Sequence, residues 1–342
     1  MKRLLAAVAA LAIAAPATAQ DKFEVKVTLF VGPQHFMSKW LVGWGEKLEK
    51  ASGGRLAFKH FPGATMGPTP AQYDLAASGR AEVAWFLHGA TPGRFPLTEL
   101  THLPYVVGSA EIGTKTINDA QLRAKYLDAE HRGVKVLLLL THQPGNILTT
   151  KKPVRAADEV RGLRLRPASP TIGSFIAALG GTPVGIAPPE QLDAMQKGTL
   201  DGTFIDYGGA GIAFKMGGTI KHVTEMYSYV SSFGIGMNPA FYNRLPADLK
   251  KLVDDSVKGV EKEVGIGWDA LDDIGKKLLV DGGAQPIKLS AAEDAKFRKV
   301  GAQVTEARLK ELEAKGLPAR QAFALIKSLS GKHAKSSRNF WN

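Results

Sequence analysis

The 342-residue sequence contains no cysteine, which excludes disulfide bonds, thiolate zinc sites and cysteine nucleophiles. It also contains no His-Glu-x-x-His, no Walker loop and no Gly-x-Ser-x-Gly motif. The eight histidines are scattered, and no two of them lie four residues apart, as a helical metal-binding pair would require. We therefore expect no enzyme activity, no metal and no cofactor, although a catalytic triad assembled from distant positions stays open at this stage.

The N-terminal apolar run is too short to cross a membrane. It extends from Leu4 to Ala15, whereas a membrane-spanning helix needs about 20 apolar residues. Lys2 and Arg3 precede the run, and the small residues "ATA" follow it at positions 17–19. This layout predicts a cleaved secretory signal over residues 1–19 and a mature protein in the periplasm.

The charge balance is basic but not concentrated. The formal net charge is +12, and the loss of Lys2 and Arg3 with the signal would lower it by two. No run of five or more Lys or Arg occurs, and together with export this argues against a nucleic-acid partner. A hydrophobic content of 44% and a charged content of 22% are typical of a soluble globular protein, and the length allows about two domains.

Predicted strands alternate with predicted helices along most of the chain, which indicates an α/β fold with mainly parallel sheets. The segment "GVKVLLLLTH" at 133–142 is apolar on both faces and predicts a central strand. Residues 246–283 predict amphipathic helix interrupted by glycines, and the tail at 331–342 is expected to be disordered.

Two segments share one pattern. "PAQYDLAASGRAEVAWFLHGA" at 70–90 and "PEQLDAMQKGTLDGTFIDYGG" at 189–209 each predict a short helix, a glycine stop and a buried strand. Ligands of open α/β sheets lie beyond the carboxyl ends of the strands, so residues 86–89 and 205–208 would face a shared space. The alternative is that both segments are merely common helix–strand connections.

Arg166 is the strongest candidate for a ligand contact. It ends the predicted strand "RGLRLRP", directly before Pro167, and can project into the loop region beyond the strand. A guanidinium there can bind a carboxylate through two parallel hydrogen bonds, which a lysine cannot reproduce. The alternative is a surface arginine paired with an acid.

Several segments resemble the solute-binding proteins of tripartite ATP-independent periplasmic (TRAP) transporters, and the similarity extends from about Phe23 to Leu329. They include "GGRLAFKHFPGATMG", "TPGRFPLTELTHLPY", "RGLRLRP", "FIAALGGTPVGIAPPEQLDAMQKGTLDG" and "LPADLKKLVDDSVKGVEKE". The resemblance implies a two-lobed protein with hinge segments and a long connecting helix. We expect lobe I at 20–145 and 235–275, and lobe II at 146–234 and 276–330.

The resemblance also implies a function. Such proteins capture one small organic acid and deliver it to the membrane permease subunits of the transporter; they are not enzymes. The arginine that pairs with the ligand carboxylate in this family corresponds to Arg166. The oligomeric state is open, with a monomer favoured.

The chain departs from the family pattern at two places, and both favour a monocarboxylate. Asn146 stands where some members carry a second arginine, and Ile205 replaces an amide that helps to hold the carboxylate. The pocket is therefore expected to be apolar and aromatic. Further wall candidates are Gln34, His35, Trp85, His88, Phe204 and Tyr207, with His142 open between lining the cleft and ending its strand. The alternatives are an exported α/β enzyme that acts on a carboxylate, and a ligand-sensing receptor subunit.

Overall fold

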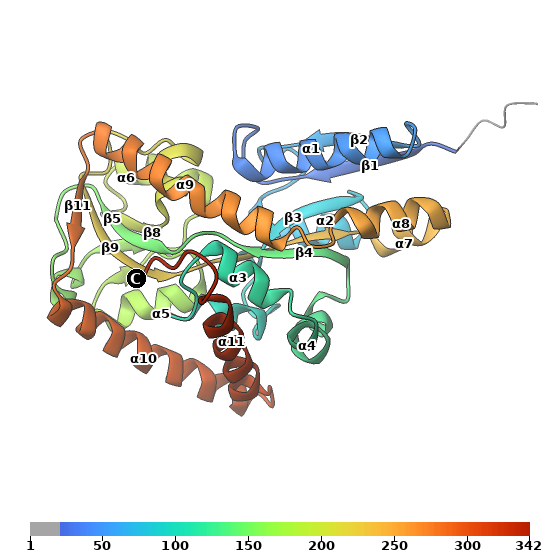
Figure 1. Ribbon diagram of the computed structural model, residues 1–342. Coiled ribbons are helices and arrows are strands. Elements are labelled where there is room, and N and C mark those ends of the chain that lie inside the picture. The colour runs from blue at the N-terminus through green and yellow to red at the C-terminus, as the bar shows by residue number, and fades with distance from the viewer. Residues whose placement is uncertain (1–20) are drawn as a thin grey trace, which may run out of the picture.

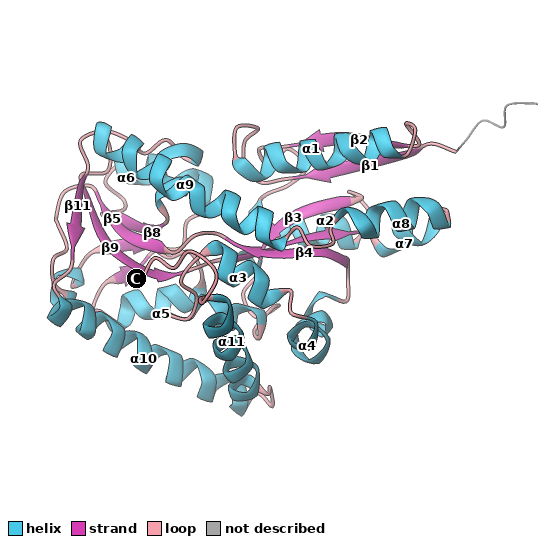
Figure 2. Cartoon of the chain, in the orientation of Figure 1, coloured by secondary structure: helices cyan, strands magenta, loops and turns pink. Residues whose placement is uncertain are grey.

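The computed structural model describes residues 21–342, which form two β-sheets wrapped by helices. Sheet A has the strand order β2-β1-β3-β10-β4, and sheet B has the order β11-β9-β5-β8-β6-β7. Figure 1 shows sheet A on the right and sheet B on the left, and Figure 2 shows how helices cover both. The strands of sheet A are β1 (Phe23–Thr28), β2 (Leu56–Phe61), β3 (Val83–Leu87), β4 (Lys135–Thr141) and β10 (Ser232–Met237). Those of sheet B are β5 (Gly145–Thr149), β6 (Arg164–Arg166), β7 (Thr182–Pro183), β8 (Gly202–Ile205), β9 (His222–Tyr229) and β11 (Gln285–Lys288).

Both sheets are mixed, although a mainly parallel arrangement was expected. The pairs β1–β2, β1–β3, β11–β9, β6–β7 and β6–β8 are parallel. The antiparallel pairs all involve β5 or β10, which follow the two points where the chain crosses between the sheets. The chain crosses from β4 into β5 and returns from β9 into β10. A strand that enters the second sheet straight from the first, without a covering helix, is free to pair antiparallel.

Strand β4 lies at the edge of sheet A, and the prediction of a central strand was wrong. Its apolar residues are buried because helices cover both of its faces. The outer edge is closed by side chains of α3 (Ala110–Ile117) and the residue after it. Asn118 accepts from the backbone N–H of Leu139 and donates to its carbonyl, and Thr114 accepts from the N–H of Thr141. These bonds replace a neighbouring strand, so apolarity on two faces did not imply a central position.

The two matching segments of the sequence fold alike. Helix α2 (Gln72–Ala77) ends before Gly79 and leads into β3, and helix α6 (Gln191–Gln196) ends before Gly198 and leads into β8. Gly79 and Gly198 have φ values of +75° and +71°, the left-handed conformation that closes a helix and that glycine adopts without strain. The carboxyl ends of β3 and β8 consequently lie at corresponding places in the two sheets.

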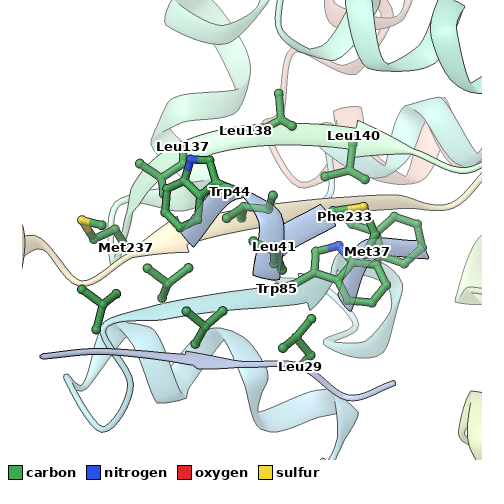
Figure 3. Close-up of a cluster of buried hydrophobic side chains, with 14 of the residues drawn as sticks. Leu29, Met37, Leu41, Trp44, Trp85, Leu137, Leu138, Leu140, Phe233 and Met237 are labelled. Carbon is green, nitrogen blue, oxygen red and sulfur yellow. The ribbon is translucent and has the colours of Figure 1, made fainter. Parts of the chain in front are cut away.

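The largest buried cluster lies between sheet A and helix α1 (Phe36–Ala51). Figure 3 shows Trp85 of β3 beside Phe233 of β10 and Met37 of α1, with Leu138 and Leu140 of β4 at the other side of the cluster. Trp85 is 1% exposed and stacks on Phe233 with ring centroids 5.0 Å apart. The aromatic end of this core is also one wall of the cavity described below.

Helix α9 (Glu261–Asp281) passes over both sheets, as Figure 1 shows. The predicted glycine breaks do not occur inside it; the chain turns at Gly259, before α9 begins. Gly265 and Gly275 instead permit close packing. A Cβ on Gly265 would lie 2.4 Å from the Cα of Glu111 in α3, and one on Gly275 would lie 2.1 Å from the carbonyl oxygen of Tyr207. The helix therefore fixes its two halves against opposite sides of the molecule.

The six other α-helices of residues 21–342 are α4 (Ala120–Leu122), α5 (Pro170–Ala178), α7 (Pro239–Arg244), α8 (Ala247–Ser256), α10 (Ala291–Ala314) and α11 (Ala319–His333). Helix α10 packs on α5 beside sheet B, but α11 packs with α3 and β4 of the sheet A side. Ala322 and Ile326 of α11 share a cluster with Ile112 and Leu139. This differs from the expected lobe II, which included all of 276–330.

The C-terminal tail is folded against the body, whereas disorder was expected at 331–342. Arg338 forms two hydrogen bonds of 3.0 Å to the carboxylate of Asp273 on α9. Trp341 Nε1 donates to the carbonyl of Tyr227 at 2.8 Å, and Phe340 stacks on the Tyr227 ring. The packing of Phe340 and Trp341 and the ion pair of Arg338 attach the tail to the rest of the protein, although its polar composition suggested disorder. The expected signal at 1–19 lies outside the described residues.

Candidate ligand-binding site

A cavity lies where the two sheets meet, at the carboxyl ends of several strands. It encloses about 480 Å³ that protein atoms do not fill, part of it open to solvent. Sheet A and the loop after β1 contribute one side, sheet B contributes the other, and residues of the crossing segments and α9 complete the lining. The lining residues are Phe30, Val31, His35, Trp85, Leu87, His142, Arg166, Ala168, Pro188, Ile205, Asp206, Gly209, Phe214, Tyr229, Ser231, Phe233 and Trp268.

Arg166 is the one cation that lines the cavity among residues 21–342. The residue is 6% exposed, and its Nε donates to the carbonyl of Ile186 at 3.2 Å. Within residues 21–342, neither Nη atom has a hydrogen-bond partner and no acid forms an ion pair with the guanidinium. Burial lowers the pKa of Arg166, yet an arginine stays protonated in proteins. The cavity therefore contains a buried positive charge without a contacting anion.

Asp206 is the only acid in the cavity wall of the described chain. Its Oδ1 accepts from the backbone N–H of Gly209 at 2.6 Å, and its Oδ2 lies 3.6 Å from His142 Nδ1. His142 Nε2 accepts from the N–H of Ser231 at 2.9 Å, which assigns the ring proton to Nδ1. Burial lowers the pKa of His142 and outweighs the opposite effect of Asp206, so the ring is neutral.

Tyr229 completes the polar end of the cavity. Its ring lies 5.7 Å from the His142 ring between centroids, and the residue is 1% exposed. Burial raises the pKa of Tyr229, so the phenol stays protonated and can donate a hydrogen bond. Arg166, Asp206, His142 and Tyr229 thus gather cationic, acceptor and donor groups at one end.

Aromatic rings form a large part of the cavity wall, and Phe233 and Trp268 lie beside the His142 ring. Phe30 stacks on Trp85 with centroids 4.7 Å apart, Trp85 stacks on Phe233 at 5.0 Å, and Phe233 is nearly parallel to Trp268 at 6.0 Å. All four rings line the cavity, so this part of its wall suits an apolar group of the ligand.

His35 lies beside this wall, at the N-terminus of α1. Its Nδ1 accepts from the N–H of Met37 as the N-cap of α1, so the ring proton of the neutral form is on Nε2. Burial lowers the pKa of His35 to about 3, and the ring is neutral at neutral pH. Its ring packs against Trp85 and Trp268, with centroids 5.3 and 5.4 Å away. His35 therefore offers one N–H donor beside the aromatic wall.

The structure brings three of the eight predicted site residues to the cavity: Arg166, Trp85 and His35. Phe204 and Tyr207 differ from the expectation. Phe204 lies on the face of β8 opposite to Ile205, because side chains of a strand alternate between its faces, and Tyr207 lies beyond the end of the strand, where this alternation stops. Ile205 and Asp206 line the cavity, whereas Phe204 packs against Phe175 on the opposite face and Tyr207 donates to Glu225 at 3.0 Å. The sequence interpretation favoured the aromatic residues of "FIDY" and overlooked the acid.

His88, Gln34 and Asn146 also lie outside the cavity wall. Trp85 and Leu87 of β3 face the cavity, so the next residue, His88, points the other way and bonds Ser232 and His131 at 2.9 Å each. Gln34 is exposed at the surface. The side chain of Asn146 is fully buried and forms hydrogen bonds with backbone groups.

Asn146 Oδ1 accepts from the N–H groups of Met226 and Tyr227, both at 2.8 Å. Tyr227 has φ +46°, which a non-glycine residue adopts only when neighbours hold it there. Asn146 thus stabilises an irregular point of β9 where the β5–β9 register shifts.

The residues that sequence analysis missed fall into two groups. Phe30, Val31 and Asp206 directly follow strands, so the rule that ligands lie beyond strand ends could have found them. Tyr229, Ser231 and Phe233 belong to the crossing between β9 and β10, and Trp268 to α9, which only the topology brings to the cavity.

Within residues 21–342, no three His, Asp or Glu side chains gather in a way that could hold a metal ion. None of the helices in that range is long and apolar enough to span a membrane.

Two β-sheets with their helices, two crossing segments and a bridging helix around a cavity that is partly open to solvent are the architecture of a two-lobed solute-binding protein. The family model described as bacterial extracellular solute-binding protein, family 7 (DctP), matches residues 29–311. The chain belongs to this family, which comprises the solute-binding proteins of TRAP transporters, and it is not an enzyme.

Solved structures of similar proteins support this assignment. A TRAP solute-binding protein from Rhodoferax ferrireducens T118, in complex with copurified benzoate, is 28% identical with a TM-score of 0.87; the match covers 92% of this chain and 99% of that one. A marine metagenome protein specific for aromatic acid ligands, with co-crystallised 3-hydroxybenzoate, is 26% identical with a TM-score of 0.87, covering 91% and 99%. A protein from Bordetella bronchiseptica with bound (R)- and (S)-mandelate is 27% identical with a TM-score of 0.81, covering 91% and 99%. The expected α/β two-lobe fold is thereby confirmed.

Proposed function

We propose that this protein captures an aromatic monocarboxylate in the cavity and holds its carboxylate on Arg166. The observation that carries the proposal is the buried guanidinium whose Nη groups have no partner within residues 21–342. A buried charge is costly unless it is paired, so the site gains most when an anion enters. A carboxylate matches the two parallel N–H donors of a guanidinium.

The remainder of the cavity supports an aromatic body on the ligand. Phe30, Trp85, Phe233 and Trp268 form a stacked wall that can enclose a ring. The cavity provides a single cation, so a second carboxylate would have no counter-charge, and Asp206 would repel it. The three solved proteins described above carry benzoate, 3-hydroxybenzoate and mandelate, and each of these is an aromatic monocarboxylate.

The second part of the proposal is delivery. The protein acts in the periplasm after removal of residues 1–19 and passes the acid to the membrane permease of a TRAP transporter. The family membership supports this role, and so does the layout of the N-terminal sequence.

Replacing the arginine tests the proposal directly. We expect Arg166→Ala to weaken binding of benzoate or mandelate by at least about tenfold, because truncating one partner of a buried charge pair costs about 2–5 kcal/mol. Isothermal titration calorimetry on purified protein, after a thermal-shift screen of aromatic acids, measures the change.

Arg164→Ala is the matched control. Arg164 lies two residues earlier in the same strand, but it is exposed and pairs with Asp201 at 2.8 Å away from the cavity. This variant should bind like the wild type, and cells that carry it should take up the acid normally, whereas cells with Arg166→Ala should not. Equal affinities for Arg166→Ala and wild type would remove Arg166 from the proposed role.

A further inference from the structure

We propose that Asp206 makes the site selective for aromatic acids with a hydroxyl group next to the carboxylate, by accepting a hydrogen bond from that hydroxyl. The inference rests on the proposed function, because it takes the carboxylate to be bound by Arg166. It goes further in assigning a second recognition group and a narrower ligand class, the aromatic 2-hydroxy acids.

The positions of the two residues follow from the pairing of their strands. Strands β6 and β8 are adjacent and parallel, with Arg166 opposite Thr203. Asp206 comes three residues later, which places its Cα about 10 Å further along the strand direction. An arginine side chain reaches most of that distance. A carboxylate held by the guanidinium thus lies near the Asp206 carboxyl group.

Shared neighbours place both residues at the same end of the cavity. His142 Nδ1 lies 3.6 Å from Asp206 Oδ2, and the His142 ring packs against Tyr229. Arg166 lines the cavity together with these three residues. Phe30, Trp85 and Phe233 form an aromatic part of the same lining. A ligand with its ring on that wall and its carboxylate at Arg166 therefore turns the intervening carbon toward Asp206.

Asp206 retains the capacity to accept another hydrogen bond. Its Oδ1 is occupied by the N–H of Gly209 at 2.6 Å. His142 Nδ1 donates to the carbonyl of Gln143 and is too far from Oδ2, at 3.6 Å, for a good hydrogen bond. The residue is only 4% exposed, so solvent satisfies Oδ2 poorly once a ligand fills the cavity.

The charge of Asp206 sets the direction of selectivity. A carboxyl group in an anion-binding cavity penalises a ligand that places only its own carboxylate or apolar atoms there. A ligand hydroxyl converts that contact into a charge-assisted hydrogen bond, which is stronger than one between neutral groups. Sites that hydrogen-bond a ligand hydroxyl strongly reject the analogue without it.

Mandelate and phenylacetate test the inference, since they differ only in the hydroxyl. We expect the wild type to bind mandelate at least about tenfold more tightly than phenylacetate, because hydrogen bonds to charged groups are the stronger ones. Asp206→Asn keeps the shape and the Oδ1 acceptor but loses the Oδ2 acceptor. In this variant the ratio of the affinity for mandelate to that for phenylacetate should fall below about threefold. The variant should bind phenylacetate at least as tightly as the wild type does. Retained phenylacetate binding also shows that the variant is folded.

Asp193→Asn is the control for net charge, because Asp193 is exposed on α6 and pairs with Lys197. It should leave the ratio unchanged. A wild-type ratio near one, or an unchanged ratio in Asp206→Asn, overturns the inference while Arg166→Ala still tests the carboxylate site by itself. Tighter binding of phenylglycine than of mandelate overturns the hydroxyl assignment in favour of an ammonium group. Failure of every aromatic acid to bind overturns the proposed function together with this inference.

Discussion

Single side chains divide into those that face the cavity and those that hold the backbone around it. Arg166 ends β6 and lines the cavity, where its guanidinium is buried without a contacting anion. Asn146, two strands away in sheet B, has the opposite role, because its carbonyl oxygen accepts two backbone N–H groups of β9. The sequence analysis named both as candidate ligand contacts, Arg166 from its position at a strand end and Asn146 from its place in the family pattern, and only Arg166 lines the cavity.

We expect Asn146→Ala to lower the free energy of unfolding by about 2 kcal/mol or more, because two buried N–H groups lose their acceptor. Urea denaturation measures the loss. Affinity for the ligand should change less than about threefold if the protein is folded. Asn243→Ala, at an exposed position of α7, should stay within about 0.5 kcal/mol of the wild type. A stable Asn146→Ala that no longer binds ligand would instead make Asn146 a ligand contact.

At the scale of elements, β3 and β8 show how far the sequence pattern of a strand predicts which side chains reach the cavity. Each follows a helix with a glycine stop, as the sequence pattern predicted. Alternate residues of β3, Trp85 and Leu87, line the cavity, and β8 contributes its last residue, Ile205. Trp85 was therefore placed correctly, but His88 and Phe204 were not, because the sequence did not reveal which of the two faces was which. A shift of one residue moves every side chain to the opposite face.

Helix α9 is the element whose glycines were misread. The sequence suggested breaks, because glycine lowers helix propensity. In the structure Gly275 sits where the backbone of Tyr207 approaches the helix, so the missing side chain serves tertiary packing. Propensity is a local property and could not show that neighbour.

We expect Gly275→Ala to lower the free energy of unfolding by about 2 kcal/mol or more, since the new Cβ would lie 2.1 Å from a backbone oxygen that cannot easily move. Thermal and urea unfolding measure the effect. Gly331→Ala is the matched control on α11, where nothing lies within 4 Å of the added Cβ. It should be neutral or stabilising by up to about 1 kcal/mol. Equal stability of the two variants would contradict close packing at α9.

At the scale of the whole molecule, three buried histidines form a series of hydrogen bonds that begins at Ser232, the first residue of β10. His102 Nε2 accepts from the N–H of Ser232 at 2.8 Å, and Ser232 Oγ lies 2.9 Å from His88 Nδ1. His88 Nε2 is bonded to His131 Nε2 at 2.9 Å, and His131 Nδ1 donates to the carbonyl of Leu127. Each of these histidines accepts a hydrogen bond through an unprotonated ring nitrogen, so protonation of that nitrogen would break the hydrogen bond.

Burial lowers the pKa of His131 from 6.5 to about 4. Between these two values the unfolded chain binds a proton that the folded protein does not, so stability falls as the pH falls. We expect the stability difference between the wild type and His131→Gln to shrink by about 2 kcal/mol from pH 7 to pH 5. Urea denaturation at several pH values measures it. A constant difference over that range would show that His131 titrates normally in the folded protein.

The sequence by itself determined the α/β class, most strands and helices and the cavity position of Arg166, because periodicity, glycine stops and strand-end positions are local properties. The resemblance of several segments determined the family. The tertiary structure decided what depends on contacts between distant segments. These are the edge position of β4, the burial of the tail through Arg338 and Trp341, and the arrival of Asp206, Tyr229 and Trp268 at one cavity. Tyr229 and Trp268 come from crossing segments and a bridging helix, whose neighbours are set by chain topology.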